Sequence, residues 1–207
     1  MNKGPRPNFL VYIVESPSPK ELYEGMSEGE LLERALSLAD IECERRLVVN
    51  RDMFEEAIGQ DFTEAVEDSD CWPPVLHFSL HGDESGIELT NGDEVSWDEL
   101  REMLIPVNSG FDETLTLCMS ACQGVQALQA AMNSGALPFV GVIGPTGDPT
   151  WSDAAIAYAA FYHLLVKTRD IDRAVEGMKA ASGYNGFTIA AAEDARRAYL
   201  EGMRRGG

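Results

Sequence analysis

Basic residues are scarce in this chain. Its 207 residues include 16 Lys and Arg against 35 Asp and Glu, which gives a formal net charge of −19. Nucleic-acid binding needs clustered cations that release counterions from the phosphates, and an anionic membrane surface attracts the same cations. We therefore expect neither nucleic acid nor a membrane among the partners of this protein.

The acidic charge is concentrated in the first half of the chain. Residues 1–110 hold 8 basic and 25 acidic side chains, a balance of −17. Two interpretations stay open at this point. The charge either keeps a solvated surface soluble or steers a basic partner or substrate toward the protein.

Cysteines and long apolar runs are also few. Four cysteines are too few for a disulfide scaffold at this length, so reduced thiols are expected. The apolar stretch in "MNKGPRPNFLVYIVESPSPK" is too short to cross a membrane and lacks a small-residue cleavage site. We expect a soluble, cytoplasmic protein that folds as a single domain over residues 1–207.

Apolar runs alternate with helical patterns along the whole chain. Strands are predicted at 9–15, 43–50, 74–80, 115–121, 137–144 and 186–190. Helices are predicted at 27–40, 51–66, 96–104, 123–133, 152–167 and 171–181, and a closing helix runs from the last strand to residue 207. The alternation predicts an α/β sandwich with a mainly parallel sheet of about six strands.

Two local sequence patterns add detail to the predicted secondary structure. Ser27 with Glu30, and Ser96 with Glu99, have the spacing of capping boxes at the starts of helices. Asn91-Gly92, between alternating residues, predicts a small hairpin after the third strand.

Two reactive residues follow neighbouring strands at their carboxyl ends, where function collects in open α/β sheets. His81 closes the strand "PVLHFSL" and Cys122 follows "LTLCMSA". Parallel neighbours lie about 4.8 Å apart, so the two side chains can face each other across the top of the sheet. The pattern predicts a thiol–imidazole pair.

Such a pair can perform acyl transfer. The imidazole of His81 takes the thiol proton, the Cys122 thiolate attacks an acyl carbon, and His81 then protonates the leaving amine. A helix start at Cys122 would lower the thiol pKa through its dipole. The backbone N–H groups of Gly82 and Cys122 are the expected oxyanion-hole donors.

The two motifs carry a family resemblance. "HFSLHG" followed by "SACQG" resembles the caspase-like fold of clan CD cysteine peptidases, and "GIELTNGDEVSWDEL" with the later "VGVIGPTGDPTWSDAA" is similar to its CHAT branch, over roughly Val75 to Ala181. The resemblance implies a three-layer α/β/α sandwich and peptide-bond hydrolysis with His81 as base and Cys122 as nucleophile. It implies no metal and no organic cofactor.

The resemblance also implies a regulated enzyme. Domains of this type act beside sensor or regulator modules, so a regulatory protein partner and a role in bacterial defence or cell death are expected, with a protein or peptide as substrate. Some relatives that cut after Arg or Lys carry Asp two positions before the nucleophile, where this chain has Ser120. Asp148 and Asp153 can restore a negative pocket, and Trp151 can line it. Asp153 has the alternative of a first-turn carboxylate that interacts with the dipole of the helix that follows.

The remaining Cys and His residues are expected to be structural. On strands, four residues extend about 13 Å, so neither His77 with His81 nor Cys118 with Cys122 can hold one zinc ion. His163 is predicted to be a partly buried histidine in the middle of a helix. Cys43 and Cys71 lack ligand-like neighbours, and Trp97 is left open between core and cleft wall.

Three other functions were weighed. A glutaminase-type amidohydrolase typically has its cysteine before its histidine, the reverse of the order here. A flavodoxin-like binder needs a glycine-rich loop after the first strand, where "ESPSPKE" stands. A catalytically silent scaffold or partner-binding module stays open as the alternative to an enzyme.

Overall fold

A computed structural model of the chain describes residues 9–131 and 135–206, with side chains through Glu201. The strands are β1 (Leu10–Ser16), β2 (Glu42–Leu47), β3 (Pro74–Gly82), β4 (Gly86–Glu88), β5 (Glu94–Ser96), β6 (Thr116–Met119), β7 (Gly141–Pro145) and β8 (Phe187–Ala191). The helices are α1 (Pro19–Glu24), α2 (Glu28–Leu38), α3 (Arg51–Glu56), η1 (Ala57–Asp61), α4 (Phe62–Asp68), α5 (Trp97–Gly110), η2 (Gly124–Ala131), α6 (Trp151–Thr168), α7 (Ile171–Ser182) and α8 (Ala192–Gly206).

The central sheet has the strand order β2-β1-β3-β6-β7-β8. All neighbours are parallel except β7 and β8, which are antiparallel. The predicted six-stranded, mainly parallel sheet is therefore confirmed. Because the inner strands are buried on both faces, they read as continuous apolar runs in the sequence.

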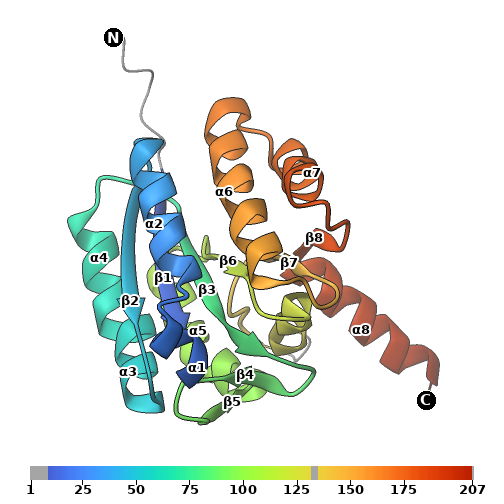
Figure 1. The fold of residues 1–207 in the computed structure, drawn as a ribbon. Coiled ribbons are helices and arrows are strands. Elements are labelled where there is room, and N and C mark those ends of the chain that lie inside the picture. Colours follow the sequence, from blue (N-terminus) through green and yellow to red (C-terminus); the bar gives the residue numbers. More distant parts are fainter. Residues whose placement is uncertain (1–8, 132–134, 207) are drawn as a thin grey trace.

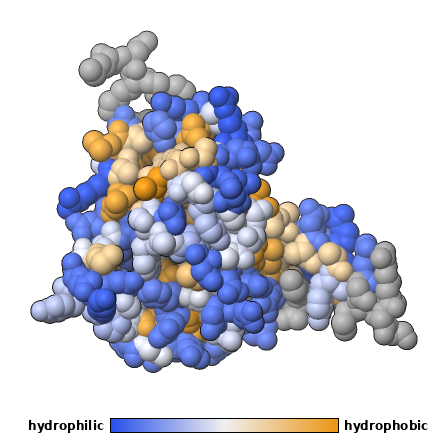
Figure 2. All heavy atoms as spheres, turned by 45° about the vertical axis from the view of Figure 1, so that its right-hand side comes forward, coloured by the Kyte–Doolittle hydropathy of each residue, from blue (hydrophilic) through white to orange (hydrophobic). Residues whose placement is uncertain are grey.

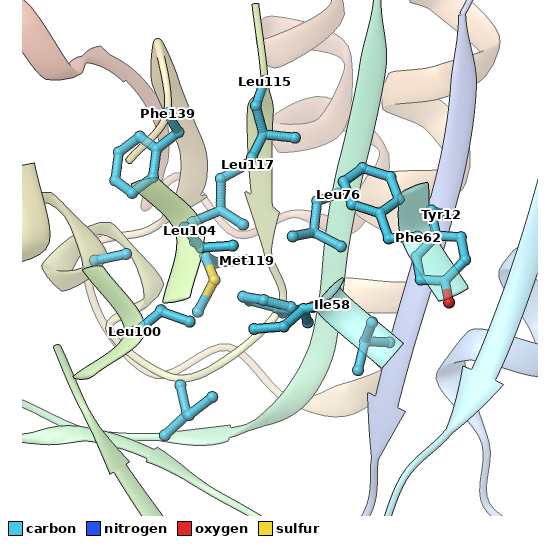
Figure 3. Packing of buried hydrophobic residues seen from close by; sticks show 14 of the residues in the cluster. Tyr12, Ile58, Phe62, Leu76, Leu100, Leu104, Leu115, Leu117, Met119 and Phe139 are labelled. Atoms are coloured by element: carbon cyan, nitrogen blue, oxygen red, sulfur yellow. The ribbon is translucent and has the colours of Figure 1, made fainter. Parts of the chain in front are cut away.

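Side chains that alternate along the strands build two separate cores, and Figure 1 shows helices on both sides of the sheet. One core packs against α3, η1, α4 and α5 and includes Leu76, Leu117 and Met119, which Figure 3 shows together with side chains of the covering helices. The other core, which includes Ile13 and Cys118, packs against α2, α6 and α7. The two cores make the three-layer sandwich that was predicted.

The hairpin after β3 is present but has a longer loop than expected. β4 pairs with β3 and with β5, both antiparallel, and residues 89–93 connect β4 to β5. Gly92 has φ +87°, a conformation that favours glycine. Asn91-Gly92 therefore lies within a five-residue connection and does not form a two-residue turn.

Several helix predictions need correction. The segment 51–68 is one helical stretch with a π-helical middle, and α1 was not predicted. Helix 123–133 was wrong in type: η2 is a 3-10 helix, and the predicted end at 132–133 lies outside the described residues, as does Gly207. The Ser27 capping box is only half formed, because Ser27 caps the Glu30 N–H while Glu30 pairs with Arg34. The Ser96 box is complete.

The surface shown in Figure 2 is covered mainly by hydrophilic side chains. In the described part of the chain, no helix is long and apolar enough to cross a membrane. The last helix, α8, projects away from the body of the molecule (Figure 1).

Candidate active site

His81 lies at the end of β3, and two other segments hold its ring. Its side chain is 36% exposed, and Nε2 lies 2.8 Å from the Glu21 Oε2 atom on α1. The Trp151 ring at the start of α6 packs edge-on against the imidazole, with 5.2 Å between ring centroids. The imidazole is therefore oriented by α1 and α6, which are far from it in sequence.

Cys122 lies in a tight turn that follows β6. Gln123 has φ +53°, which is rare for a residue with a side chain and marks a constrained backbone. Its N–H donates to Gly147 O at 2.8 Å, which ties the turn to the loop after β7. A Cβ atom on Gly124 would lie 2.6 Å from Met119 Cβ, so the close return of the chain requires glycine there.

The register of β3 and β6 aligns the segments that lead to the two reactive residues. His77 pairs with Cys118, and His81 and Cys122 are separated by the same 41 positions. The pairing continues past the end of β6, since the Ser120 N–H donates to Phe78 O at 2.8 Å. Side chains two and four residues on along a strand share a face, so His81 lies on the face covered by α2 and α6. Cys122 lies in the turn beyond Met119, the last residue of β6.

A buried polar network at the positions two residues before His81 and Cys122 supports this register. Glu28 on α2 accepts hydrogen bonds from Ser79 on β3 and Ser120 beyond β6, each at 2.7 Å. His77 lies 3.1 Å from the Ser120 hydroxyl and 2.9 Å from the Tyr162 hydroxyl. One carboxyl group thus bridges the positions that precede His81 and Cys122 on the same face.

Burial changes the protonation of this network. It raises the pKa of Glu28 to about 7, although the hydrogen bonds from Ser79 and Ser120 act in the opposite direction. It lowers the pKa of His77 to about 3, so this imidazole stays neutral. His77 and Cys118 are buried strand residues, as predicted.

Gly82 and Cys122 present backbone N–H groups near the turn. N–H directions alternate along a strand, and Phe78 O points to β6, so the Gly82 N–H points to that side as well. A Cβ atom on Gly82 would lie 3.3 Å from Ala121 Cβ. In the described part of the chain, no backbone carbonyl accepts the Cys122 N–H.

The expectation of a low thiol pKa was wrong. Burial raises the pKa of Cys122, the negative charge of Asp148 raises it further, and its own N–H lowers it only in part. Within the described residues, no hydrogen bond joins Cys122 Sγ to His81. The thiol therefore rests in its protonated form at neutral pH.

Replacing Asp148 with Asn is expected to increase the alkylation rate of Cys122 by iodoacetamide at pH 7.5 about two- to tenfold. Removing the carboxylate lowers the thiol pKa, and one pKa unit is a tenfold change in thiolate. Intact-mass labelling measures the rate, and Glu67→Gln, an exposed carboxylate on α4, is the control for net charge. An unchanged or slower rate in Asp148→Asn would contradict this electrostatic assignment.

The structure places the four predicted pocket residues differently. Asp148 is exposed and close enough to Cys122 to act on its charge, and Trp151 packs on His81. Ser120 is 6% exposed, and its hydroxyl bonds within the buried network. Asp153 completes a capping box with Thr150 at the start of α6.

Tyr184 is a neighbour of the site that the sequence did not indicate. Burial is the main cause that raises the pKa of the Tyr184 hydroxyl, and the charges of Asp148 and Cys122 raise it further. A hydrogen bond that the Tyr184 oxygen accepts from the Gly147 backbone acts in the opposite direction. A Cβ atom added to Gly147 would lie 2.7 Å from this hydroxyl. Tyr184 therefore packs against the loop that carries Asp148.

A cavity of about 420 Å³ opens beside His81 over the hairpin. Cross-strand pairing puts His81, Glu88 and Glu94 in one row on the same face. Gly86 and Ser96, whose side chains are small, also line the cavity. Asp83, Glu88, Glu94 and Glu99 line it, so the hollow is strongly acidic.

The other Cys, His and Trp residues lie elsewhere. His163 is exposed on α6, which corrects the prediction of partial burial, and Trp97 is a core residue. Within the described residues, none of the four cysteines forms a disulfide, and burial raises the pKa of Cys43 to about 12. In residues 9–131 and 135–206, no group of three or more His, Cys, Asp or Glu side chains is arranged to hold a metal ion.

Glu21 is the functional residue that sequence reasoning missed. The signal was present in "SPSPKE": Ser18 followed by Pro19 and, at the third helical position, Glu21 is the pattern of a capped helix start. The contact with His81, 60 positions away, has no local signal.

Solved cysteine protease structures share this fold. Two structures of a secreted C11 cysteine protease from Bacteroides thetaiotaomicron, one with an irreversible peptide inhibitor, match with TM-scores of 0.61 and 0.62. Their identities are 11% and 10%, and the matches cover 91% and 92% of this chain and 67% and 68% of the other. The crystal structure of drICE matches with a TM-score of 0.52 and 15% identity, over 90% of this chain and 88% of the other.

These likenesses establish the fold alone. The chain has a caspase-like α/β sandwich fold. No protein-family model matches the sequence, and no curated protein sequence matches it.

Proposed function

We propose that this caspase-like chain is a cysteine endopeptidase that cuts a protein substrate through a His81–Cys122 dyad. The observation that carries the proposal is the strand register: His77 on β3 pairs with Cys118 on β6, and His81 and Cys122 each follow four positions later. The solved structures with the same fold are cysteine proteases, and one holds a peptide inhibitor. We take residues 1–207 as one peptidase domain of the CHAT type.

The proposed reaction needs only groups of this chain and water. His81 takes the Cys122 proton as the sulfur attacks the scissile carbonyl, and the N–H groups of Gly82 and Cys122 bind the oxyanion. The C–N bond then breaks as His81 protonates the leaving amine, which leaves a thioester. Water, deprotonated by His81, hydrolyses the thioester and releases the free thiol.

The charges around the dyad support a basic substrate. Asp148 acts on Cys122 from the loop after β7, and the cavity beside His81 carries four carboxylates. Arg or Lys side chains near the scissile bond would gain charge-assisted hydrogen bonds there. Because Ser120 is committed to the buried network, Asp148 is the proposed carboxylate for such a side chain.

Two features support control by a regulatory protein partner. The Cys122 thiol has a raised pKa, and it makes no hydrogen bond to His81 in the described residues. A partner or substrate that brings the thiol and imidazole into contact would activate the pair. The resemblance to CHAT domains favours a bacterial defence or cell-death pathway as the setting.

The proposal is tested with peptidyl chloromethyl ketones that differ only in the residue before the reactive group: Arg, Lys, Asp or Gln. We expect a single adduct at Cys122, fastest with Arg or Lys, and identified by intact mass and peptide mapping. Iodoacetamide, which needs no recognition, is the control for thiol access. If iodoacetamide labels Cys122 while none of the peptides reacts, the silent-scaffold alternative replaces the enzyme.

A further inference from the structure

The short helix α1 holds a carboxylate in a fixed place above the end of β3. Ser18 and Glu21 form a complete capping box, in which the Glu21 N–H donates to Ser18 Oγ at 3.3 Å and the Ser18 N–H donates to Glu21 Oε2 at 2.8 Å. Pro19 fixes the first helical position. The two reciprocal hydrogen bonds with Ser18 thus hold the Glu21 carboxylate in place in the first turn of α1.

The same Oε2 atom faces His81. It lies 2.8 Å from His81 Nε2, and the Glu21 side chain is only 16% exposed. Burial raises the pKa of Glu21, but the hydrogen bonds with His81 and Ser18 outweigh that effect and lower it. The carboxyl group is therefore ionised at neutral pH, and an ionised carboxylate only accepts hydrogen bonds.

This polarity fixes the tautomer of the imidazole. Since Glu21 accepts, His81 Nε2 must carry the proton, and Nδ1 is left as the basic nitrogen. The edge-on Trp151 ring, at an interplanar angle of 84°, restricts rotation of the imidazole. A flipped or rotated ring would lose the contact with Glu21.

We propose that Glu21 is a positioning residue that keeps His81 protonated on Nε2, so that Nδ1 receives the proton of Cys122. The role of His81 as base rests on the proposed peptidase function. When the Cys122 S–H bond breaks, its proton moves to Nδ1 and both ring nitrogens are protonated. The Glu21 carboxylate keeps its charge, takes no proton, and stabilises the imidazolium.

A merely structural role would have a different outcome. In that case Glu21 only caps α1, and its replacement would loosen the helix without changing the imidazole. Three variants separate the two roles: Glu21→Ala, Glu21→Asp, which keeps the charge on a shorter side chain, and Glu24→Gln. Glu24 is the last residue of the same helix, lies 3.9 Å from Lys20 and takes no part in the capping box, so it serves as the matched control.

The test is ¹⁵N NMR of the imidazoles in the full chain at about pH 8.5, where neutral rings show their tautomer. The chain has three histidines, and His81→Ala assigns the signals of His81. We expect Nε2–H in the wild type and in Glu24→Gln, a tautomer mixture in Glu21→Ala, and partial recovery in Glu21→Asp. An Nδ1–H tautomer in the wild type, or no change in Glu21→Ala, overturns the proposal, and the first result needs no variant to fold.

A kinetic arm separates this proposal from the proposed function. Glu21→Ala is expected to slow the reaction of Cys122 with the Arg chloromethyl ketone at least about tenfold, with Glu24→Gln unchanged. If no peptide reacts with the wild type but the tautomer still depends on Glu21, the peptidase proposal fails and the positioning of His81 stands. If Cys122 in Glu21→Ala reacts with the Arg chloromethyl ketone at the wild-type rate, the positioning role is overturned.

Discussion

Replacing His81 with Ala is expected to lower kcat/KM for a basic peptide about a thousandfold, and replacing Cys122 with Ala to abolish hydrolysis. Without the imidazole, the thiol keeps its proton, because burial and Asp148 both raise its pKa. General acid–base catalysis is worth about a hundred- to ten-thousandfold in enzymes of this kind. Without the sulfur, no thioester forms and no activity is left from this route. Both effects are measured as hydrolysis of a fluorogenic peptide. The residue before its scissile bond is the one that gave the fastest chloromethyl ketone labelling of Cys122.

Two matched variants control this experiment. His163 is exposed on α6, and Cys71 is a half-buried cysteine outside the site, so His163→Ala and Cys71→Ala are expected to leave kcat/KM within about twofold of wild type. Circular dichroism checks that every variant folds. Hydrolysis that survives in Cys122→Ala would place the chemistry at another residue and remove the basis of the proposed function.

The architecture was predictable because its signals are local and repeated. Buried parallel strands give apolar runs, as in Leu10–Ser16 and Pro74–Gly82, and amphipathic helices follow them. The predicted positions of His81 and Cys122 follow from the same strands, because chain direction gathers the carboxyl ends on one edge. The register that pairs His77 with Cys118, four positions before each of them, was not in the sequence pattern and comes from packing.

The predictions that failed depend on contacts between distant segments. The dipole argument for a low thiol pKa considered only the helix after Cys122, whereas Asp148 approaches from the loop after β7 and the helix is a 3-10 helix. Ser120 is predicted to line the substrate pocket, but in the structure its hydroxyl donates a hydrogen bond to Glu28 on α2. Glu21 was missed because α1 buries none of its residues and leaves no apolar pattern.

The buried network beneath the site is expected to set the pH dependence of stability. The pKa of Glu28 is raised from 4.5 to about 7, so the folded protein binds more protons than the unfolded chain between these values. Its contribution is fully present below pH 4.5 and is lost as the pH rises to 7, up to about 3 kcal/mol. The pKa of His77, lowered from 6.5 to about 3, works in the opposite direction, since its contribution is lost as the pH falls from 6.5 to 3.

The two slopes oppose each other between pH 4.5 and 6.5, so the wild type is expected to show a nearly flat free energy of unfolding there. Glu28→Gln removes one slope and keeps an amide that can bond to Ser79 and Ser120. Its stability relative to wild type should increase as the pH rises from 4.5 to 8, by up to about 3 kcal/mol. Urea unfolding at fixed temperature across this range measures it, and Glu67→Gln controls for the loss of an exposed carboxylate. A constant difference between Glu28→Gln and wild type at all pH values would mean that Glu28 titrates alike in the folded and unfolded chain, and that its burial beneath the dyad leaves its proton affinity unchanged.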